Sequence, residues 1–417
     1  MRREMREKRR RVFLKYDFDQ IINRQHTNAM STDGFRGYIF HVGPEATFAF
    51  KDEEFVRMWV ADMDFAVAPE IRDAMKARID QQIFGYTSLF DPEYFKIFSD
   101  WCQARYGYVF PKEELVFSQG VVPALFQILE LLVAQDEKVL THTPAYGQFL
   151  RAAEYNGIMM EKAPLKNENG DYNIDFDDLE RRAADPKLKI IIFCNPHNPT
   201  GRIWTMEELQ KVAAIAEKHD LWLISDEIHC DLLRQGKTHI PMAKVMPDYP
   251  KLITCMSASK TFNIAGLMHS HIMIRDCALR EAFLQRDKAG GCLNPISLAA
   301  HKAAYANGSA WLDALKTYLD GNFSLVKEMF ETHLPKITFK IPEATYLAWV
   351  DMRPYLSDMK DIPMFFANEA GVLLEGGDSL FVGNAEGFIR LNLAMPRAVL
   401  EEGLNRIFAA VKKHIAN

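Results

Sequence analysis

Cysteine is scarce in this sequence, and the cysteines that occur do not form a metal-binding or redox pattern. Six cysteines are scattered along the chain, and no two of them make a C-x-x-C motif. This spacing excludes zinc-ribbon and dithiol-redox proteins and is typical of reduced cytoplasmic thiols. Apolar runs long enough to span a bilayer are also lacking, and no signal-peptide core follows the charged segment Met1–Arg11. We therefore expect a cytoplasmic protein without a membrane partner.

Nucleotide-binding and metal-binding motifs are lacking as well. No G-x-G-x-x-G occurs, so a nicotinamide site has no support. Gly236-Lys237 followed by Thr238 resembles the end of a P-loop, but Asp231 stands where the first glycine belongs. Asp62 and Asp64 have no neighbouring histidine or cysteine, and two carboxylates alone rarely hold a metal. We expect no metal site.

The overall charge gives no sign of a nucleic-acid partner. The chain has 50 basic and 56 acidic residues, a net charge of −6, which argues against a general nucleic-acid binder. Seven basic residues do lie between Arg2 and Arg11, interrupted by Glu4 and Glu7. Such a segment is either a nucleic-acid arm or a solvated tail, and we favour the tail.

The length and composition indicate a large enzyme-sized protein with more than one core. The chain has 417 residues, 48% of them hydrophobic, which is longer than a single core usually grows. We expect an N-terminal arm and part of a small domain in residues 1–62. A large domain is expected in residues 63–300, and the rest of the small domain in residues 301–417.

Strands and helices are predicted to alternate between about Leu115 and Arg275, which indicates an α/β fold with a mostly parallel sheet and right-handed crossovers. Lys189–Cys194 is a near-continuous apolar run, as in a strand covered on both faces. Thr205, with Glu208 three residues later, forms a capping box that opens a helix. Strands are predicted at 138–142, 189–194, 221–224 and 252–256, and helices at 124–134 and 205–219.

The pattern changes from about Pro295 onward. This part is predicted to be mainly helical up to Phe330 and then to alternate short strands with helices, as in a smaller α+β domain. The first sixty or so residues are expected to pack with it. Strands are predicted at 338–341, 346–351 and 388–393, and a closing helix at 397–414.

Three polar motifs each follow one of the apolar strands. They are Asn195–Gly201 (N-P-H-N-P-T-G), Ser225–His229 (S-D-E-I-H) and Ser257–Lys260 (S-A-S-K). In open α/β sheets, ligands bind at the carboxyl ends of the strands, so the amide, carboxylate and amine of these motifs are expected to converge. Each motif alone is a weak signal, because each also occurs as an ordinary turn or strand end. Their fixed order after successive strands makes the combination specific.

This set of groups meets the needs of pyridoxal phosphate. A lysine amine, Lys260, can form a Schiff base with the aldehyde, and Asp226 can keep the pyridine nitrogen protonated so that the ring accepts electrons. Asn198 can donate a hydrogen bond to the phenolate oxygen. Hydroxyl groups and the start of a helix can hold the phosphate. Those candidates are Ser257, Ser259, Gly120, Val121 and Val122.

Longer motifs show that the sequence resembles fold-type I pyridoxal-phosphate enzymes of the class I/II aminotransferase superfamily. More narrowly, it is similar to the MalY/PatB-type cystathionine β-lyases and to cystalysin. The resemblance covers nearly the whole chain after about Lys15. It rests on the motifs Trp59–Phe65, Gly85–Thr87, Asp226–Asp231, Ser257–Leu267, Ala344–Asp351 and Gly387–Asn392.

The resemblance implies an aspartate-aminotransferase-like fold, a homodimer and a role for each matched residue. Lys260 would be the Schiff-base lysine and the proton-transfer base, and Tyr146 would stack on the cofactor ring. Tyr86 would reach the phosphate bound by the neighbouring subunit. Arg390 would hold the substrate α-carboxylate with a two-pronged contact, assisted by the backbone near Ala61.

Two positions depart from the aminotransferase pattern. Aminotransferases of this superfamily commonly carry an arginine eight residues after the lysine, and this sequence has Met268 there. They often carry a tyrosine three residues after the aspartate, and this sequence has His229. His229 would then be either a group just behind the cofactor or a core histidine. Both departures point toward the lyase subgroup.

The resulting hypothesis is a carbon–sulfur β-lyase that converts a sulfur amino acid to pyruvate, ammonia and a thiol. The alternative is an aminotransferase, which shares every step up to removal of the α-proton and needs a 2-oxo acid. A regulator that uses this fold to bind effectors is a third reading. We give it less weight because too few residues precede Trp59 for an added DNA-binding module.

Overall fold

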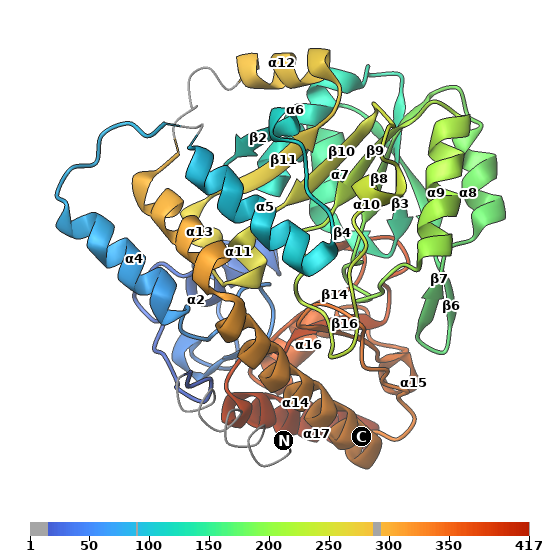
Figure 1. Ribbon diagram of the computed structural model, residues 1–417. Coiled ribbons are helices and arrows are strands. Elements are labelled where there is room, and N and C mark those ends of the chain that lie inside the picture. The colour runs from blue at the N-terminus through green and yellow to red at the C-terminus, as the bar shows by residue number, and fades with distance from the viewer. Residues whose placement is uncertain (1–15, 89–90, 287–292, 417) are drawn as a thin grey trace, which may run out of the picture.

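The computed structural model describes residues 16–88, 91–286 and 293–416 (Figure 1). The basic segment between Arg2 and Arg11, for which a solvated tail is predicted, lies outside the described residues. Within them, no helix combines the length and the apolar character needed to cross a membrane.

A seven-stranded sheet forms the centre of the larger part of the molecule, with strand order β2-β11-β10-β9-β8-β3-β5. Five neighbouring strands, from β10 to β5, run parallel, and β11 is antiparallel to both of its neighbours. The predicted α/β fold with a mostly parallel sheet is therefore confirmed. The strands are β2 (Leu115–Ser118), β3 (Lys138–Thr143), β5 (Met159–Pro164), β8 (Leu188–Cys194), β9 (Trp222–Asp226), β10 (Leu252–Met256) and β11 (Ser270–Ile274).

Both faces of this sheet are covered by helices, as the apolar run in β8 predicts. Ile191 and Phe193 belong to one hydrophobic cluster, and Ile190 and Ile192 belong to another, because alternate side chains of a strand point to opposite faces. On the second face lie α6 (Val121–Leu132), α7 (Gly147–Tyr155) and α12 (Cys277–Arg286). On the first face lie α5 (Pro92–Tyr106), α8 (Phe176–Ala183), α9 (Met206–Lys218), α10 (Met242–Val245) and α13 (Pro295–Asn307), and α4 (Pro69–Asp80) packs against α13.

The predicted capping box at the start of α9 is present. The Thr205 hydroxyl accepts from the Glu208 backbone N–H at 3.2 Å, and the Glu208 carboxylate accepts from the Thr205 N–H at 2.7 Å. These two bonds satisfy donors that the first helical turn leaves free.

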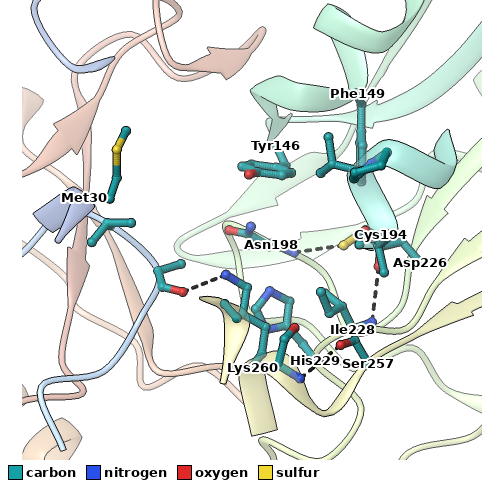
Figure 2. A pocket seen from close by; sticks show the side chains of 18 of the residues that line it. Met30, Tyr146, Phe149, Cys194, Asn198, Asp226, Ile228, His229, Ser257 and Lys260 are labelled. Carbon is teal, nitrogen blue, oxygen red and sulfur yellow. Dashed lines mark hydrogen bonds between the residues drawn. The ribbon is translucent and has the colours of Figure 1, made fainter. Parts of the chain in front are cut away.

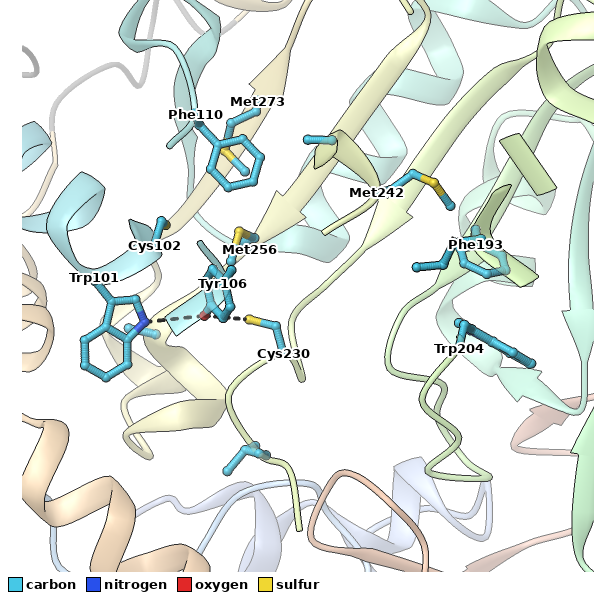
Figure 3. Packing of buried hydrophobic residues seen from close by; sticks show 14 of the residues in the cluster. Trp101, Cys102, Tyr106, Phe110, Phe193, Trp204, Cys230, Met242, Met256 and Met273 are labelled. Carbon is cyan, nitrogen blue, oxygen red and sulfur yellow. Dashed lines mark hydrogen bonds between the residues drawn. The ribbon is translucent and has the colours of Figure 1, made fainter. Parts of the chain in front are cut away.

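The first cluster also fixes the segment that carries the predicted lysine. Tyr106 of α5 and Thr261 of α11 (Ala258–Thr261) both donate to the buried Asp231 carboxylate, at 2.6 and 3.0 Å. Figure 3 shows Tyr106 between Trp101 and Cys230, whose sulfur lies 3.2 Å from the Tyr106 hydroxyl. A buried acceptor with two donors holds α11 firmly against the core.

The C-terminal part packs around a three-stranded antiparallel sheet with order β12-β16-β14. The long helix α14 (Ser309–His333) leads into it, and α17 (Arg397–Ala416) closes it, as predicted (Figure 1). Its strands are β12 (Leu347–Asp351), β16 (Phe388–Asn392) and β14 (Glu375–Gly376). The remaining helices of this part are α15 (Arg353–Leu356) and α16 (Ile362–Glu369).

The strand predicted at 338–341 is wrong. Phe339 is buried and its neighbours Thr338 and Lys340 are exposed, which is the alternation that suggested a strand. These residues belong to no sheet, however, and Lys340 forms an ion pair with Asp171 instead. Alternating burial shows that a segment lies extended on a core, whereas a strand also needs a hydrogen-bonded neighbour.

The N-terminal residues pack on the C-terminal part. The strand β1 (Val56–Arg57) pairs in parallel with β13 (Val372–Leu373), and Phe35 and Trp59 share a hydrophobic cluster with Phe381. Residues 35–59 thus contact the C-terminal part, whereas Tyr16 and Phe18 belong to the cluster on the first face of the large sheet. The division of the chain into domains at residues 62 and 300 stays a prediction. The other short elements are α2 (Met30–Asp33), α3 (Phe35–Tyr38), β4 (Ala145–Tyr146), β15 (Phe381–Val382) and the hairpin of β6 (Lys166–Glu168) and β7 (Asp171–Asn173).

Candidate active site

The three polar motifs meet at one cavity of about 300 Å³. It lies at the carboxyl ends of β8, β9 and β10, and the N-terminal and C-terminal parts form its other side (Figure 2). Every predicted site residue except Tyr86 lines it. These residues are Ala61, Gly120, Val121, Val122, Tyr146, Asn198, Asp226, His229, Ser257, Ser259, Lys260 and Arg390.

Lys260 stands in the first turn after β10. Ser257 caps this turn by accepting from the Ser259 N–H at 3.0 Å, and the Lys260 Nζ donates to the Ala61 carbonyl at 2.6 Å. The pKa of Lys260 is lowered to about 8, chiefly by burial; the charge of Asp62 opposes this shift and that of Arg390 contributes to it. A larger fraction of this amine is therefore neutral near neutral pH than for an exposed lysine, as a nucleophilic lysine requires.

Asp226 is the last residue of β9 and is 5% exposed. Burial raises its pKa to about 7, although a hydrogen bond from the Ile228 N–H at 3.2 Å favours the charged form. A buried carboxylate of this kind is stabilised as an anion when a cation lies against it. A protonated ring nitrogen in the cavity would be such a partner.

Glu227, the next residue, is buried, and its carboxylate accepts three hydrogen bonds. It accepts from the Ser225 hydroxyl at 2.8 Å, from His239 Nε2 at 2.8 Å and from the Met242 N–H at 2.9 Å. These bonds anchor the loop after β9 and so keep Asp226 directed at the cavity.

Asn198 and Arg390 approach each other across the cavity. Arg390 Nη1 donates to the Asn198 Oδ1 at 3.2 Å, which leaves the Asn198 amide nitrogen as its donor group. Arg390 Nη2 donates to the Trp59 carbonyl at 3.3 Å and forms an ion pair with Glu375. Arg390 is 2% exposed, so the whole arrangement lies away from bulk water.

Tyr146 lies across the cavity from Lys260 (Figure 2). It is held there because β4 pairs with β15, with Tyr146 opposite Phe381. This pairing joins the large sheet's loop to the C-terminal part. Burial raises the pKa of Tyr146, so its hydroxyl stays protonated.

His229 lines the cavity and is therefore more than a core histidine. Its ring lies 6.5 Å from that of Tyr346 in an edge-to-face contact, and its Nδ1 has no hydrogen-bond partner among the described residues. The pKa of His229 is lowered to about 3, chiefly by burial and also by the charges of Lys260 and Arg390. The ring is thus neutral and holds an unused polar atom near the lysine.

The cavity's other end is built from hydroxyls and a helix start. Ser257 and Ser259 face the N-terminus of α6, which Gly120 precedes without a side-chain cap. The first N–H groups of a helix have no partner within it and favour an anion. Met268, at the position where aminotransferases carry an arginine, is 55% exposed and does not line the cavity. Tyr86 is 97% exposed and lies outside the cavity.

Sequence reasoning missed several lining residues, of which Glu375 is the most consequential. It is 4% exposed and stands opposite Arg390 in the register of β14 and β16. The feature of the sequence that could have indicated Glu375 is its single charge directly after the apolar run Val372–Leu374. Tyr346, within a motif quoted above but given no role there, donates to the Ala61 carbonyl at 2.7 Å beside Lys260.

Asp62 and Asp64, considered above as metal ligands, are both engaged by one arginine. Arg24 contacts Asp62 at 2.5 Å and Asp64 at 2.9 Å. This contact ties the N-terminal segment to the loop that presents Ala61 to Lys260.

Comparison with known proteins agrees with this geometry. The family described as aminotransferase class I and II matches residues 53–407. The chain belongs to this family. Within it, the chain is 40% identical to the cystathionine β-lyase PatB of Bacillus subtilis, over 85% of this chain and 92% of PatB. It is 31% identical to the protein MalY of Escherichia coli, over 95% of this chain and 99% of MalY.

One solved structure shares both the fold and much of the sequence. The PLP-bound C–S lyase from Staphylococcus hominis superposes with a TM-score of 0.89 at 46% identity, covering 95% of this chain and 98% of that one. The predicted resemblance to the lyase subgroup is therefore confirmed.

Proposed function

We propose that this protein is a pyridoxal-phosphate-dependent carbon–sulfur β-lyase. The observation that carries this proposal is the identity of 46% with a PLP-bound C–S lyase over 95% of the chain. The arrangement of Lys260, Asp226 and Asn198 around one cavity supports it independently.

The residues present fit the cofactor. A lysine with a lowered pKa and a buried carboxylate with a raised pKa are the two groups that an aldehyde and a ring nitrogen need. The uncapped start of α6 and the Ser259 hydroxyl suit a phosphate, whereas the Ser257 hydroxyl already donates to the His269 carbonyl at 2.7 Å. Pyridoxal phosphate, when bound, supplies an aldehyde for amines and a ring that accepts electrons from the substrate's α-carbon.

The chain's own residues then have separate tasks. Lys260 takes the α-proton with its Nζ, and Asp226 keeps a proton on the ring nitrogen. Asn198 donates to the phenolate oxygen through its amide nitrogen. Arg390 would bind the substrate α-carboxylate, and Tyr146, across the cavity from Lys260, would hold the cofactor ring in place.

The reaction breaks the bond between the β-carbon and sulfur. The sulfur leaves with the bonding electrons and takes up a proton to become a thiol. The remaining carbon skeleton reacts with water to give pyruvate and ammonia, so the products account for the amino acid plus one water.

The test is pyruvate release from cystathionine or a cysteine S-conjugate, measured without any added 2-oxo acid. We expect pyruvate and thiol in equal amounts. A requirement for a 2-oxo acid, with no thiol released, would identify the aminotransferase alternative instead.

We propose further that the protein acts as a homodimer. Tyr86 lies in an exposed segment with Ile83 and Phe84, which are 72% and 55% exposed. An apolar surface of this kind favours a protein contact, and Tyr86 of the partner subunit would then complete the phosphate site. Sedimentation should give twice the chain mass, and Tyr86→Phe should weaken cofactor binding; a monomer with full cofactor affinity would contradict this.

A further inference from the structure

Glu375 is a carboxylate built into the wall of the substrate cavity. It lies on β14 directly opposite Arg390 on β16, and the two side chains form a buried ion pair. A buried carboxylate beside a single arginine is costly to desolvate and needs a reason within the site. The chemistry described above assigns Glu375 no task.

The arginine that must receive the substrate is already engaged. Besides Glu375, its donors contact the Asn198 side-chain oxygen and the Trp59 carbonyl. Arg390 Nε has no hydrogen-bond partner within the part of the chain that the structure describes. A guanidinium has five N–H donors, so an entering α-carboxylate can share Arg390 with Glu375.

The charges of the lining residues then leave Glu375 uncompensated. Among the described residues that line the cavity, the formally charged ones are Asp226, Lys260, Glu375 and Arg390. Asp226 and Lys260 are committed to the cofactor under the proposed function. Burial raises the pKa of the Glu375 carboxyl, whereas the charges of Arg390 and Lys260 and the contact with Arg390 oppose this shift and favour the carboxylate. Once the substrate α-carboxylate shares Arg390, the negative charge of the Glu375 carboxylate is no longer balanced by the lining residues. Nearby Arg24 is paired with Asp62 and Asp64 and offers no compensation.

We propose that Glu375 is a specificity-determining residue, which makes the cavity reject amino acids with an acidic side chain and accept those with a neutral or cationic sulfur substituent. The reason is Coulomb repulsion in a site that excludes water, where a second carboxylate meets a like charge. This inference rests on the proposed function for the identity of the substrates, and it concerns charge rather than size.

The first test uses two S-substituted cysteines of nearly equal shape. S-carbamoylmethyl-cysteine ends in a neutral amide, and S-carboxymethyl-cysteine ends in a carboxylate. The kcat/KM for pyruvate release should favour the amide by roughly 10-fold to 100-fold in the wild type. In Glu375→Gln this ratio should fall at least tenfold, and comparing the ratio between enzymes cancels the different leaving-group reactivities. Glu375→Asp keeps the charge and should keep the preference.

A binding measurement separates this inference from the lyase assignment. Calorimetric titration of the holoenzyme with asparagine and aspartate, another isosteric pair, needs no turnover. The wild type should bind asparagine more tightly, and Glu375→Gln should reduce the difference. If no pyruvate forms from any conjugate, the proposed function fails while this titration still tests Glu375.

Two results would overturn the role of Glu375. If Glu375→Gln weakens both members of a pair by the same factor, the residue merely positions Arg390. If the wild type itself binds aspartate as tightly as asparagine, the charge of Glu375 does not select substrates, and this second result stands even if the variant does not fold.

Discussion

The two sides of the cavity are built on different principles. The sheet wall (Asn198, Asp226, Ser257 and Lys260) lies at the carboxyl ends of the parallel strands β8, β9 and β10. The C-terminal wall (Glu375 and Arg390) comes from two strands of a small antiparallel sheet, and its charges oppose each other directly. The sheet wall is suited to holding a cofactor and moving a proton, and the C-terminal wall to choosing a substrate. Substitutions in the sheet wall should therefore reduce turnover and cofactor binding, and substitutions in the C-terminal wall should change substrate binding.

The largest effect is expected at the sheet wall, from Lys260→Ala. Removing the amine removes the base that takes the α-proton, so pyruvate release should fall by about 10³-fold. Cofactor should still bind through the phosphate and ring contacts. Turnover and the cofactor content after gel filtration are the measurements, with Lys260→Arg as the matched variant that keeps the charge. Near-normal turnover in either variant would contradict the role of Lys260.

Asp226→Asn should have the next largest effect on the same wall. The amide has no charge to hold a proton on the ring nitrogen, and a hydrogen bond to a charged group contributes about 1.5–3 kcal/mol. Both kcat and cofactor affinity should drop by about 100-fold, measured by pyruvate release and by titration of the apoprotein with cofactor. Asp226→Glu keeps the charge and should recover part of both. If the Asp226→Asn variant bound the cofactor as tightly as the wild type, the cofactor ring would not lie against Asp226.

The sheet-wall residues could be predicted from the sequence, whereas Glu375 could not. Asn198, Asp226 and Lys260 each follow an apolar strand, and parallel strands bring their carboxyl ends together by topology. Glu375 lies on a strand of two residues, and its meaning depends on a pairing with Arg390 that no local pattern encodes. The same limit explains the error at 338–341, where alternation was visible but the absence of a neighbouring strand was not.

On the C-terminal wall, Arg390→Lys should change substrate binding more than turnover. A lysine keeps the charge but loses the planar two-pronged contact with a carboxylate. The KM should rise roughly 30-fold while kcat changes by less than about threefold. Initial-rate kinetics with a neutral cysteine conjugate measure both. If only kcat fell, Arg390 would act in the chemical step, as the sheet-wall residues do, and not in substrate binding.

The smallest effect is expected away from both walls, at the capping box of α9. Thr205→Ala removes the hydroxyl that accepts from Glu208 and should lower the free energy of unfolding by about 1 kcal/mol. The kcat/KM should stay unchanged, because no residue of α9 lines the cavity. Thr205→Ser keeps the hydroxyl and serves as the control in denaturant unfolding. A change in substrate preference would show that the two walls are less independent than proposed.

Covalent attachment of the cofactor to Lys260 can be tested directly. Borohydride treatment of the holoenzyme reduces such a linkage to a stable bond, and peptide mass spectrometry then locates it. We expect a pyridoxyl phosphate adduct on the peptide that contains Lys260. An adduct on a different lysine, or no adduct in a protein that still releases pyruvate, would contradict it.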